Sequence, residues 1–445
     1  MQTILQNKTF GMISLGCDKN RVDAERLLGL IRSKGCRITA DIAEAQVLIV
    51  NTCAFLNEAR KEAIDTVIEC DACRGGKLEK LVVAGCLPEK YVGELFPSLT
   101  EGDVFIGCAD ADALFSALER SYAGERVNAV HTGREWKGAR VLTTPLHYGY
   151  LKIADGCSNH CTYCLIPQIR GRYRSYPMEE LVEEAASLGE LSELILVAQD
   201  TTRYGEELYG KNKFVELIQR LSALENIGSL RLLYCYPDVI TEELIQEFAR
   251  NGKLIKYIDI PLQHSEDRVL KLMNRKGSRK SYLELIARLR EAVPGIAVRS
   301  TFIAGFPTET AEECEALASF LREARLTNCG FFAYSREPGT AAYRLPAQVS
   351  AREKQRRVRE LYAVQRKISA QFLQEKVGTC VQVLCDGVDE ETGGRFVGRA
   401  YWSAPEIDGK VYFRAPFAEQ GKTYAVHITA ADSYDLYGQT PDFEG

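Results

Sequence analysis

Short hydrophobic runs alternate with stretches of helical periodicity along the first 130 residues. Four runs have the length and composition of buried strands: 8–15, 47–53, 81–86 and 103–108. Helical patterns follow the first two runs, at 20–33 and 58–69. Strands that alternate with helices form a parallel sheet with helices on both faces. The pattern therefore predicts a doubly wound α/β domain over residues 1–130.

A second alternating series follows a polar, irregular linker at 131–145. Its candidate strands begin at 147 and continue at 194–200, 230–237, 257–263, 297–307 and 329–335. Its helical patterns include 178–189, 213–224, 241–250, 266–273 and 279–292, and a long helix is expected at 350–374. Such a run of βα units predicts a partial or full parallel barrel over residues 143–370.

The pattern changes again in the last segment, residues 371–441. Short alternating strands separated by Gly and Asp turns predict a small antiparallel β-barrel of the oligonucleotide-binding type. From residue 371 to the end there are twelve Asp and Glu residues against six Lys and Arg residues. An acidic barrel suits a basic protein partner better than RNA, and the alternative is a solvated acidic surface with no partner. The basic residues at 352–359 in the preceding helix keep RNA open as an alternative.

Composition makes the cysteines informative. The formal net charge of −5 excludes a basic field over the whole protein, and 46% hydrophobic residues suit a globular chain with a sizeable core. We see no signal peptide and no apolar run of membrane-spanning length, so a cytoplasmic protein is expected. Fifteen cysteines in that compartment favour metal binding or catalysis over disulfides. Six are predicted to be small buried hydrophobes: Cys36, Cys235, Cys314, Cys329, Cys380 and Cys385.

One cysteine motif has a spacing with strong chemical meaning. Cys157, Cys161 and Cys164 form a C-x3-C-x2-C pattern directly after the first strand of the second series. Three thiolates on one loop hold three irons of a [4Fe–4S] cluster and leave the fourth iron open. That iron can chelate S-adenosylmethionine (SAM), whose cleavage makes a radical able to attack an unactivated carbon. A zinc site that includes His160 is the weaker alternative.

Residues near that motif and at later strand ends are candidates for contact with SAM. Tyr163 can lie against the adenine or ribose, Gln199 and Asp200 follow the second strand, and Gly305 suits a close backbone approach after the fifth. The alternative for Tyr163 is simple packing, and for the others an ordinary βα turn.

A second set of cysteines follows the strands of the first domain. Cys17, Cys53 and Cys86 each come at a strand end, and strand ends of a parallel sheet converge on one edge. Three thiolates there suit a second cluster with an open iron, with Asn20 and Asn51 near the sulfurs. Cys108 also ends a strand, and we favour a role for it other than ligation. The pair Cys70 and Cys73 is interpreted as structural.

These residues resemble the methylthiotransferases, a family of radical SAM enzymes. The matching segments are SLGCDKNRVDAE, NTCAF, AGCLPEKY, DGCSNHCTYCLIPQIRG, GFPTET and YSREPGTAA. The resemblance implies an N-terminal domain, a radical SAM domain and a C-terminal TRAM domain. It also implies two [4Fe–4S] clusters, one bound by Cys17, Cys53 and Cys86 and the other by Cys157, Cys161 and Cys164.

Within the family, the sequence is more similar to the branch that modifies an aspartate of small-subunit ribosomal protein S-twelve. SLGCDKN, IDIPLQH, LLYCYPD and GRAYWSAPEIDG carry this similarity. The branch implies transfer of a methylthio group to the β-carbon of the aspartate, a reductant such as a flavodoxin or ferredoxin, no membrane partner and contact with the ribosome. The alternatives are a transfer RNA adenosine methylthiotransferase and a non-catalytic iron–sulfur protein.

Overall fold

The computed structural model describes residues 5–108, 110–133 and 135–443. Its contacts divide the chain into two compact units. The first contains the described residues up to Thr143, together with Asp155–Ser158 and Cys164–Tyr173. The second contains Thr144–Ala154, Asn159–Tyr163 and the described residues from Arg174 onward. The two units therefore share the segment that carries the C-x3-C-x2-C motif.

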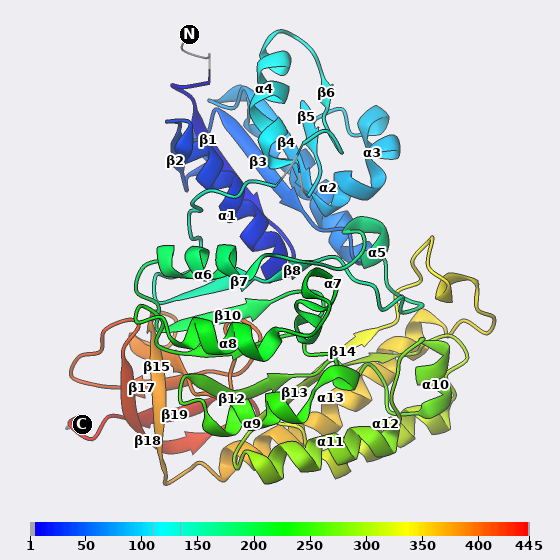
Figure 1. Ribbon diagram of the computed structural model, residues 1–445, viewed down its shortest axis with the longest axis vertical. Helices are drawn as coiled ribbons and strands as arrows, with labels where there is room; N and C mark the ends of the chain where they lie inside the picture. The colour runs from blue at the N-terminus through cyan, green and yellow to red at the C-terminus, as the bar shows by residue number, and fades with distance from the viewer. Residues whose placement is uncertain (1–4, 109, 134, 444–445) are drawn as a thin grey trace. The chain divides into compact units, whose positions relative to one another are not determined.

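The first unit contains a parallel sheet of six strands in the order β2-β1-β3-β4-β5-β6 (Figure 1). The strands are β1 (Thr9–Ser14), β2 (Arg37–Thr39), β3 (Val47–Thr52), β4 (Lys80–Gly85), β5 (Val104–Ile106) and β6 (Val127–Asn128). The helices are α1 (Asp18–Ser33), α2 (Asn57–Asp71), α3 (Cys86–Ser98), α4 (Leu114–Tyr122) and α5 (Ile166–Ile169). The chain order reverses at β1, because β2 lies on one side of it and β3 on the other.

Alternating side chains of the central strands point into two separate cores. Val47 and Ile49 of β3 pack in a core with residues of α1 and α4. Leu48 and Val50 pack in a second core with residues of α2 and α3. Helices therefore cover both faces, and the predicted doubly wound α/β fold is confirmed. The short edge strands β2 and β6 have too few residues for their alternation to be recognised in the sequence.

The second unit contains another parallel sheet, with the order β14-β13-β12-β11-β10-β7. Its strands are β7 (Tyr148–Lys152), β10 (Glu193–Val197), β11 (Leu230–Leu232), β12 (Leu254–Asp259), β13 (Ala297–Ala304) and β14 (Asn328–Ala333). The sheet is open, so of the two predicted forms the structure has the partial barrel. Two short strands, β8 (Ala154–Asp155) and β9 (Arg174–Ser175), flank the cysteine segment along the chain.

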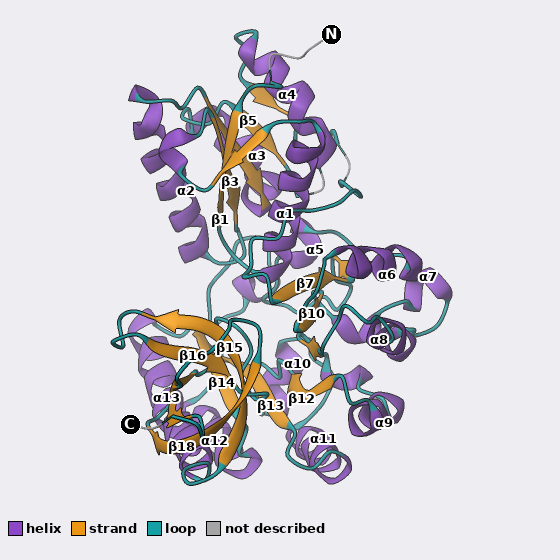
Figure 2. Cartoon of the chain, turned by 90° about the vertical axis from the view of Figure 1, so that its left-hand side faces the viewer, coloured by secondary structure: helices purple, strands orange, loops and turns teal. Residues whose placement is uncertain are grey.

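Helices follow the strands of this sheet and form a row on its outer side. They are α6 (Met178–Ser187), α7 (Glu206–Tyr209), α8 (Phe214–Ser222), α9 (Glu242–Arg250), α10 (Asp267–Leu272), α11 (Arg279–Ala292), α12 (Ala311–Ala324) and α13 (Ala351–Gln374). Neighbours in the row α6-α8-α9-α11-α12-α13 contact one another, and α8, α9 and α11 are seen together in Figure 2. A capping box of Thr310 and Glu313 fixes the start of α12, so the preceding loop has a defined exit from β13.

The last segment of the second unit forms a closed five-stranded barrel in the order β15-β16-β17-β19-β18. Its strands are β15 (Cys380–Asp389), β16 (Arg395–Arg399), β17 (Val411–Arg414), β18 (Thr423–Ala431) and β19 (Leu436–Gln439). The predicted small β-barrel is confirmed. Its pairs are antiparallel except β17 with β19, which are parallel and close the barrel. The sequence pattern did not predict β19.

Buried charges attach this barrel to the parallel sheet within the second unit. Glu193 of β10 accepts hydrogen bonds from Arg231 of β11 and Arg399 of β16. Arg231 also donates to the carbonyl of Tyr401 at 2.9 Å, and Asn328 of β14 donates to the carbonyl of Trp402 at 2.8 Å. The barrel is therefore held in part by charged side chains that are removed from water.

None of the helices in the described part of the chain is both long enough and apolar enough to cross a membrane.

Candidate functional site

The first unit brings Cys17, Cys53 and Cys86 to the carboxyl edge of its sheet. Cys17 is the N-cap of α1 after β1, Cys53 directly follows β3, and Cys86 is the first residue of α3 after β4. Burial, together with the neighbouring thiols of Cys86 and Cys17, raises the pKa of Cys53 to about 11. Cys53 thus lies within electrostatic range of both other thiols, in line with the convergence of strand ends on one edge.

Tight turns with glycine lead into two of these cysteines. Gly16 has φ +96°, and a Cβ placed on it would lie 2.8 Å from Cys53 Cβ. Gly85 has φ +94°, and its Cβ would lie 2.5 Å from Asn51 Oδ1. Both positions require a residue without a side chain, because the backbone is left-handed and a neighbouring side chain occupies the space.

Asn20 and Asn51 tie the loops of this edge together. Asn20 Nδ2 donates to the carbonyl of Leu15 at 2.6 Å and to that of Thr52 at 3.2 Å. Asn51 Nδ2 donates to the carbonyl of Asn20 at 2.7 Å. Asn20 also approaches a sulfur, since its Oδ1 lies 4.0 Å from Cys86 Sγ. The two amides therefore mainly hold the backbone that carries the cysteines.

A fourth thiol, Cys108, lies beside this group. Its Sγ is 3.7 Å from Cys86 Sγ, and its backbone N–H donates to Glu89 Oε2 at 2.8 Å. The hydrogen bond from Cys108, together with Arg170, lowers the pKa of Cys86 to about 7 against the effect of burial. Burial raises the pKa of Cys108 well above its ordinary value. The pair thus favours a thiolate on Cys86 and a protonated thiol on Cys108.

Arg170 is a residue of this site that the sequence analysis missed. Its Nη2 donates to Cys86 Sγ at 3.2 Å and to Asn20 Oδ1 at 3.2 Å. Its Nη1 forms ion pairs with Asp23 and Asp155, and its side chain is only 3% exposed. The residue lies in the QIRG end of the cysteine motif, so its position was visible, but its partners are distant in the sequence.

Cys157 and Cys164 also belong to the first unit. The N–H of Cys157 donates to the carbonyl of Gly171 at 3.1 Å, and the N–H of Ile166 donates to Cys164 Sγ at 3.4 Å. Gly156 has φ +75°, and a Cβ on it would lie 2.2 Å from the carbonyl oxygen of Arg172. The returning chain therefore packs directly against the start of the cysteine segment.

Cys161 belongs to the second unit, where residues after β11 and α10 surround it. Tyr236 Oη lies 3.4 Å from Cys161 Sγ, and Arg275 Nη1 lies 3.9 Å from it. The adjacent Thr162 is fixed by hydrogen bonds of its N–H to the carbonyl of Met273 and of its hydroxyl to that of Leu272. Hydrogen bonds therefore fix the backbone next to the Cys161 thiol.

Arg275 provides a test of whether this place suits an anionic group. The residue is 7% exposed, and its Nε is buried without a hydrogen-bond partner in the described structure. No carboxylate of the described residues lies within ion-pair distance of it, whereas its Nη2 donates to the carbonyl of Pro261. A buried cation with an unused donor beside a thiol fits an anionic iron–sulfur cluster bound at that thiol.

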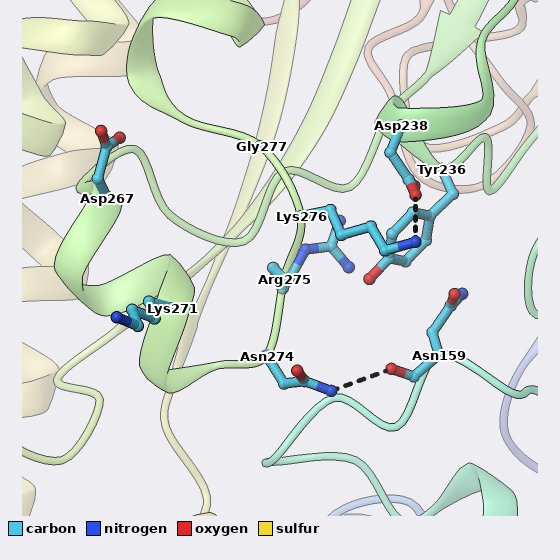
Figure 3. Close-up of a pocket in the computed structure, with 9 residues that line it drawn as sticks. All are labelled: Asn159, Tyr236, Asp238, Asp267, Lys271, Asn274, Arg275, Lys276 and Gly277. Carbon is cyan, nitrogen blue, oxygen red and sulfur yellow. Dashed lines mark hydrogen bonds and ion pairs between the residues drawn. The ribbon is translucent and has the colours of Figure 1, made fainter.

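A cavity of about 220 Å³ opens next to these residues (Figure 3). Tyr236 and Arg275, which contact Cys161, form part of its wall, as does Asn159 of the cysteine segment. The other lining residues are Asp238, Asp267, Lys271, Asn274, Lys276 and Gly277. Lys276 forms an ion pair with Asp238 at 3.6 Å, so the cavity has a mixed polar lining.

The four candidate SAM contacts lie in different settings within the second unit. Tyr163 packs against a cluster that includes Phe306 and Tyr334, in keeping with the packing alternative. Asp200 is fully buried and accepts hydrogen bonds from Asn159 at 2.9 Å and from Thr202 at 2.7 Å. Asp200 therefore holds a residue that lies between Cys157 and Cys161.

Gln199, the residue before Asp200, is half-buried. Gly305 has φ +72°, and a Cβ on it would lie 2.4 Å from Lys354 Cγ. The close approach expected at Gly305 is thus made by a side chain of α13. Contact of these four residues with SAM stays a prediction.

The remaining cysteines follow the sequence analysis with one clear exception. Cys36, Cys235, Cys314 and Cys385 are buried and Cys329 is half-buried, but Cys380 is exposed. Cys380 begins β15 on the outward face of the alternation, so its prediction as a buried hydrophobe is wrong. Cys70 is buried near the end of α2, and burial raises the pKa of its thiol to about 11, as suits a structural cysteine.

Family models match three segments of the chain. One described as the radical SAM superfamily matches residues 151–321, one described as uncharacterized protein family UPF0004 matches 9–107, and one for the TRAM domain matches 377–440. These segments lie within the predicted domains 1–130, 143–370 and 371–441, whose boundaries stay predictions. The fold and the matched segments together define a radical SAM protein with a TRAM barrel, which implies a [4Fe–4S] cluster and SAM.

The same fold occurs in a solved structure of low sequence identity. The radical S-adenosylmethionine methyltransferase TsrM of Kitasatospora setae, with cobalamin and a [4Fe–4S] cluster bound, has a TM-score of 0.54 and 13% identity. The likeness covers 84% of this chain and 79% of that protein and concerns the fold alone.

Relatives of much higher identity identify the family. The chain is 43% identical over 438 residues to the ribosomal protein uS12 methylthiotransferase RimO of Thermoanaerobacter sp. (strain X514), covering 97% of this chain and 100% of the relative. It is 44% identical over 442 residues to the protein of the same name from Trichlorobacter lovleyi, covering 98% of both chains. The chain belongs to the RimO family of ribosomal protein uS12 methylthiotransferases.

Proposed function

We propose that this protein transfers a methylthio group to the β-carbon of an aspartate in ribosomal protein uS12, the S-twelve protein of the small subunit. The observation that carries the proposal is the gathering of Cys17, Cys53 and Cys86 at one sheet edge in a chain of this family. A radical SAM protein without a second thiol group would have one cluster only. The first unit instead offers three thiols where a second cluster can be held.

The proposed ligands divide into two sets of three. Cys17, Cys53 and Cys86 would hold one [4Fe–4S] cluster, and Cys157, Cys161 and Cys164, within one segment of eight residues, would hold the other. When bound, these clusters and SAM supply the electron, the hydrogen-abstracting radical and the methylthio group. Cys108 is proposed to remain a protonated neighbour, because burial favours its thiol form.

Residues of the chain orient and charge-balance the two sets. Arg170 donates to Cys86 and Arg275 lies beside Cys161, so each set has a guanidinium next to one thiol. Asp200 fixes Asn159 in the second cysteine segment. Tyr163, Gln199, Asp200 and Gly305 are the proposed SAM contacts.

The surface of the barrel supports a basic protein as the substrate. Tyr412 of β17 and Tyr437 of β19 stack with their ring centroids 5.6 Å apart. A hydrogen bond to Asp432 raises the pKa of Tyr437 to about 12, and Asp435 and Asp389 add negative charge near Tyr412. Stacked aromatics with an acidic surrounding attract a positively charged protein and repel RNA phosphates.

The test compares the two macromolecular substrates directly. The full chain, reconstituted anaerobically with iron and sulfide, is incubated with SAM, dithionite and either purified uS12 or transfer RNA. We expect uS12 to gain the mass of one methylthio group in place of one hydrogen, with the change on an aspartate, and transfer RNA to stay unmodified. Modification of transfer RNA alone would overturn the proposal.

A cysteine variant distinguishes the roles of the two proposed clusters. Cys53→Ala is expected to keep the formation of 5′-deoxyadenosine but to lose thiolation, because only the second set of thiols remains complete. Cys36→Ala is the matched control, since Cys36 is buried in the same unit and donates to the carbonyl of Leu5. Full product formation by Cys53→Ala would show that the assignment of the first cluster is wrong.

The physiological electron donor is proposed to be a flavodoxin or ferredoxin. The substrate further implies that the reaction takes place in the cytoplasm, in contact with the ribosome or with free uS12. Replacing dithionite by a purified flavodoxin or ferredoxin, each with its reductase, should sustain turnover, and absence of turnover with both carriers would exclude this class of donor.

A further inference from the structure

The environment of Arg275 differs from that of other buried arginines in the second unit. Arg231, Arg357 and Arg399 each form an ion pair with a buried carboxylate. Arg275 is equally removed from water but has no such carboxylate among the described residues, and its Nε is without a partner. A guanidinium in this position is unfavourable unless an opposite charge lies nearby.

The groups that do surround Arg275 are a thiol and aromatic rings. Its Nη1 lies 3.9 Å from Cys161 Sγ, and its guanidinium carbon lies 4.1 Å from the ring centroid of Tyr236. An arginine guanidinium is not deprotonated in proteins. The guanidinium therefore stays charged and faces a site where a negative charge is expected.

We infer that Arg275 is a positioning residue that supplies the counter-charge of the iron–sulfur cluster bound through Cys161 and raises the reduction potential of that cluster. The inference rests on the proposed function, because that function makes Cys161 a ligand. One electron enters the cluster on reduction, no bond is formed at Arg275, and the negative charge facing the guanidinium grows by one. A fixed cation in a low dielectric stabilises the more negative state more strongly, so reduction becomes easier.

A purely mechanical role is the alternative. Arg275 Nη2 donates to the carbonyl of Pro261, and its guanidinium lies over the ring of Tyr236, so the residue also holds the loop after β12. A lysine at this position can supply the counter-charge but cannot fill the mechanical role. Lysine keeps the charge but loses the planar group and the fork of donors.

The experiment measures the midpoint potential of the cluster in Arg275→Gln, Arg275→Lys and the native chain. Each full-length protein is reconstituted, its iron is counted, and the reduced cluster is titrated by electron paramagnetic resonance. The signal that changes when SAM is added identifies the cluster of the second cysteine set. Lys276→Gln is the matched control, because it removes an adjacent positive charge whose side chain is 78% exposed.

We expect Arg275→Gln to lower the equilibrium constant for one-electron reduction at least tenfold, which corresponds to about 59 mV. Arg275→Lys should stay close to the native potential, and Lys276→Gln should change it much less than Arg275→Gln because water screens the exposed charge. If Arg275→Gln loses the cluster while Arg275→Lys keeps it at the native potential, that result would also support a role for the positive charge.

Three results would overturn the inference. They are an unchanged potential in Arg275→Gln with a full complement of iron, an equal shift in the lysine and glutamine variants, or loss of the cluster in both. If the native chain itself shows no signal that responds to SAM, the proposed function fails and the inference fails with it.

Discussion

The buried carboxylate of Glu193 allows a quantitative test of how the barrel is held on the parallel sheet. Its Oε2 accepts a hydrogen bond from Arg399 Nη1 at 2.7 Å, and its Oε1 accepts one from Arg231 Nε. The side chain is 2% exposed. Glu193→Gln keeps the shape of the side chain but leaves the two guanidiniums without their shared negative charge.

The expected loss follows from the pKa of Glu193. Burial opposes ionisation, but Arg231 and Arg399 outweigh it and lower the pKa from 4.5 to about 2. At about 1.4 kcal/mol for each pKa unit, the ionised carboxylate contributes about 3 kcal/mol to the free energy of unfolding at neutral pH. A lowered carboxylate pKa gives stability that is complete above the unfolded pKa. The contribution is lost as the pH falls toward 2, and about 1 kcal/mol remains at pH 3.

Fluorescence offers a local assay for this interface. The chain has two tryptophans, and Trp402 is buried where the barrel meets β14. In a Trp136→Phe background, urea unfolding followed at Trp402 reports the second unit. We expect the free energy of unfolding of the native protein to exceed that of Glu193→Gln by about 3 kcal/mol at pH 7 and by about 1 kcal/mol at pH 3.

A surface carboxylate provides the control for this measurement. Glu179 pairs with Arg220, but its side chain is 67% exposed, so Glu179→Gln should leave the unfolding curve unchanged at both pH values. Equal unfolding midpoints for the native protein and Glu193→Gln at pH 7 would refute the electrostatic reasoning. So would a difference that stays the same at pH 3.

Two further predictions concern the first unit. Arg170→Met leaves two buried carboxylates without their counter-charge and should destabilise the iron-free unit by about 3–5 kcal/mol in calorimetry. Arg120→Met removes one partner of an exposed ion pair and should leave the midpoint temperature of unfolding unchanged. An equal effect of the two changes would contradict the role of burial. Gly16→Ala should displace Cys53 and lower the iron content from about eight to about four per chain. Gly35→Ala has a similar φ of +76° in open space and should retain its iron, so full iron in Gly16→Ala would disprove the steric argument.

The local pattern was sufficient for features that depend on neighbouring residues. The continuous apolar run from Val47 to Val50 predicts a strand buried on both faces, and strands followed by helices favour a parallel sheet. The spacing of Cys157, Cys161 and Cys164 carries its chemistry within eight residues. Even the approach of Cys53 to Cys86 was predictable, because strand ends of such a sheet share one edge.

Tertiary structure decided which polar residues serve these cysteines. In the sequence, Arg170 and Arg275 resemble ordinary charged residues of helices and loops, and Asp200 resembles an ordinary turn residue. Their partners Cys86, Cys161 and Asn159 are 84, 114 and 41 positions away. Contacts over such separations depend on how elements pack.

The closure of the barrel shows the same division. The alternation in the last segment predicted a small barrel, but it did not show that β19 would pair in parallel with β17. Four residues are too few to define a period, and the pairing of β19 depends on its position between β17 and β18 in the closed barrel. The sequence by itself therefore determined the elements, the fold class and the cysteine motifs, because these depend on short-range periodicity and spacing. Only the folded chain decided the counter-charges and the closing strand, because burial and long-range packing determine them.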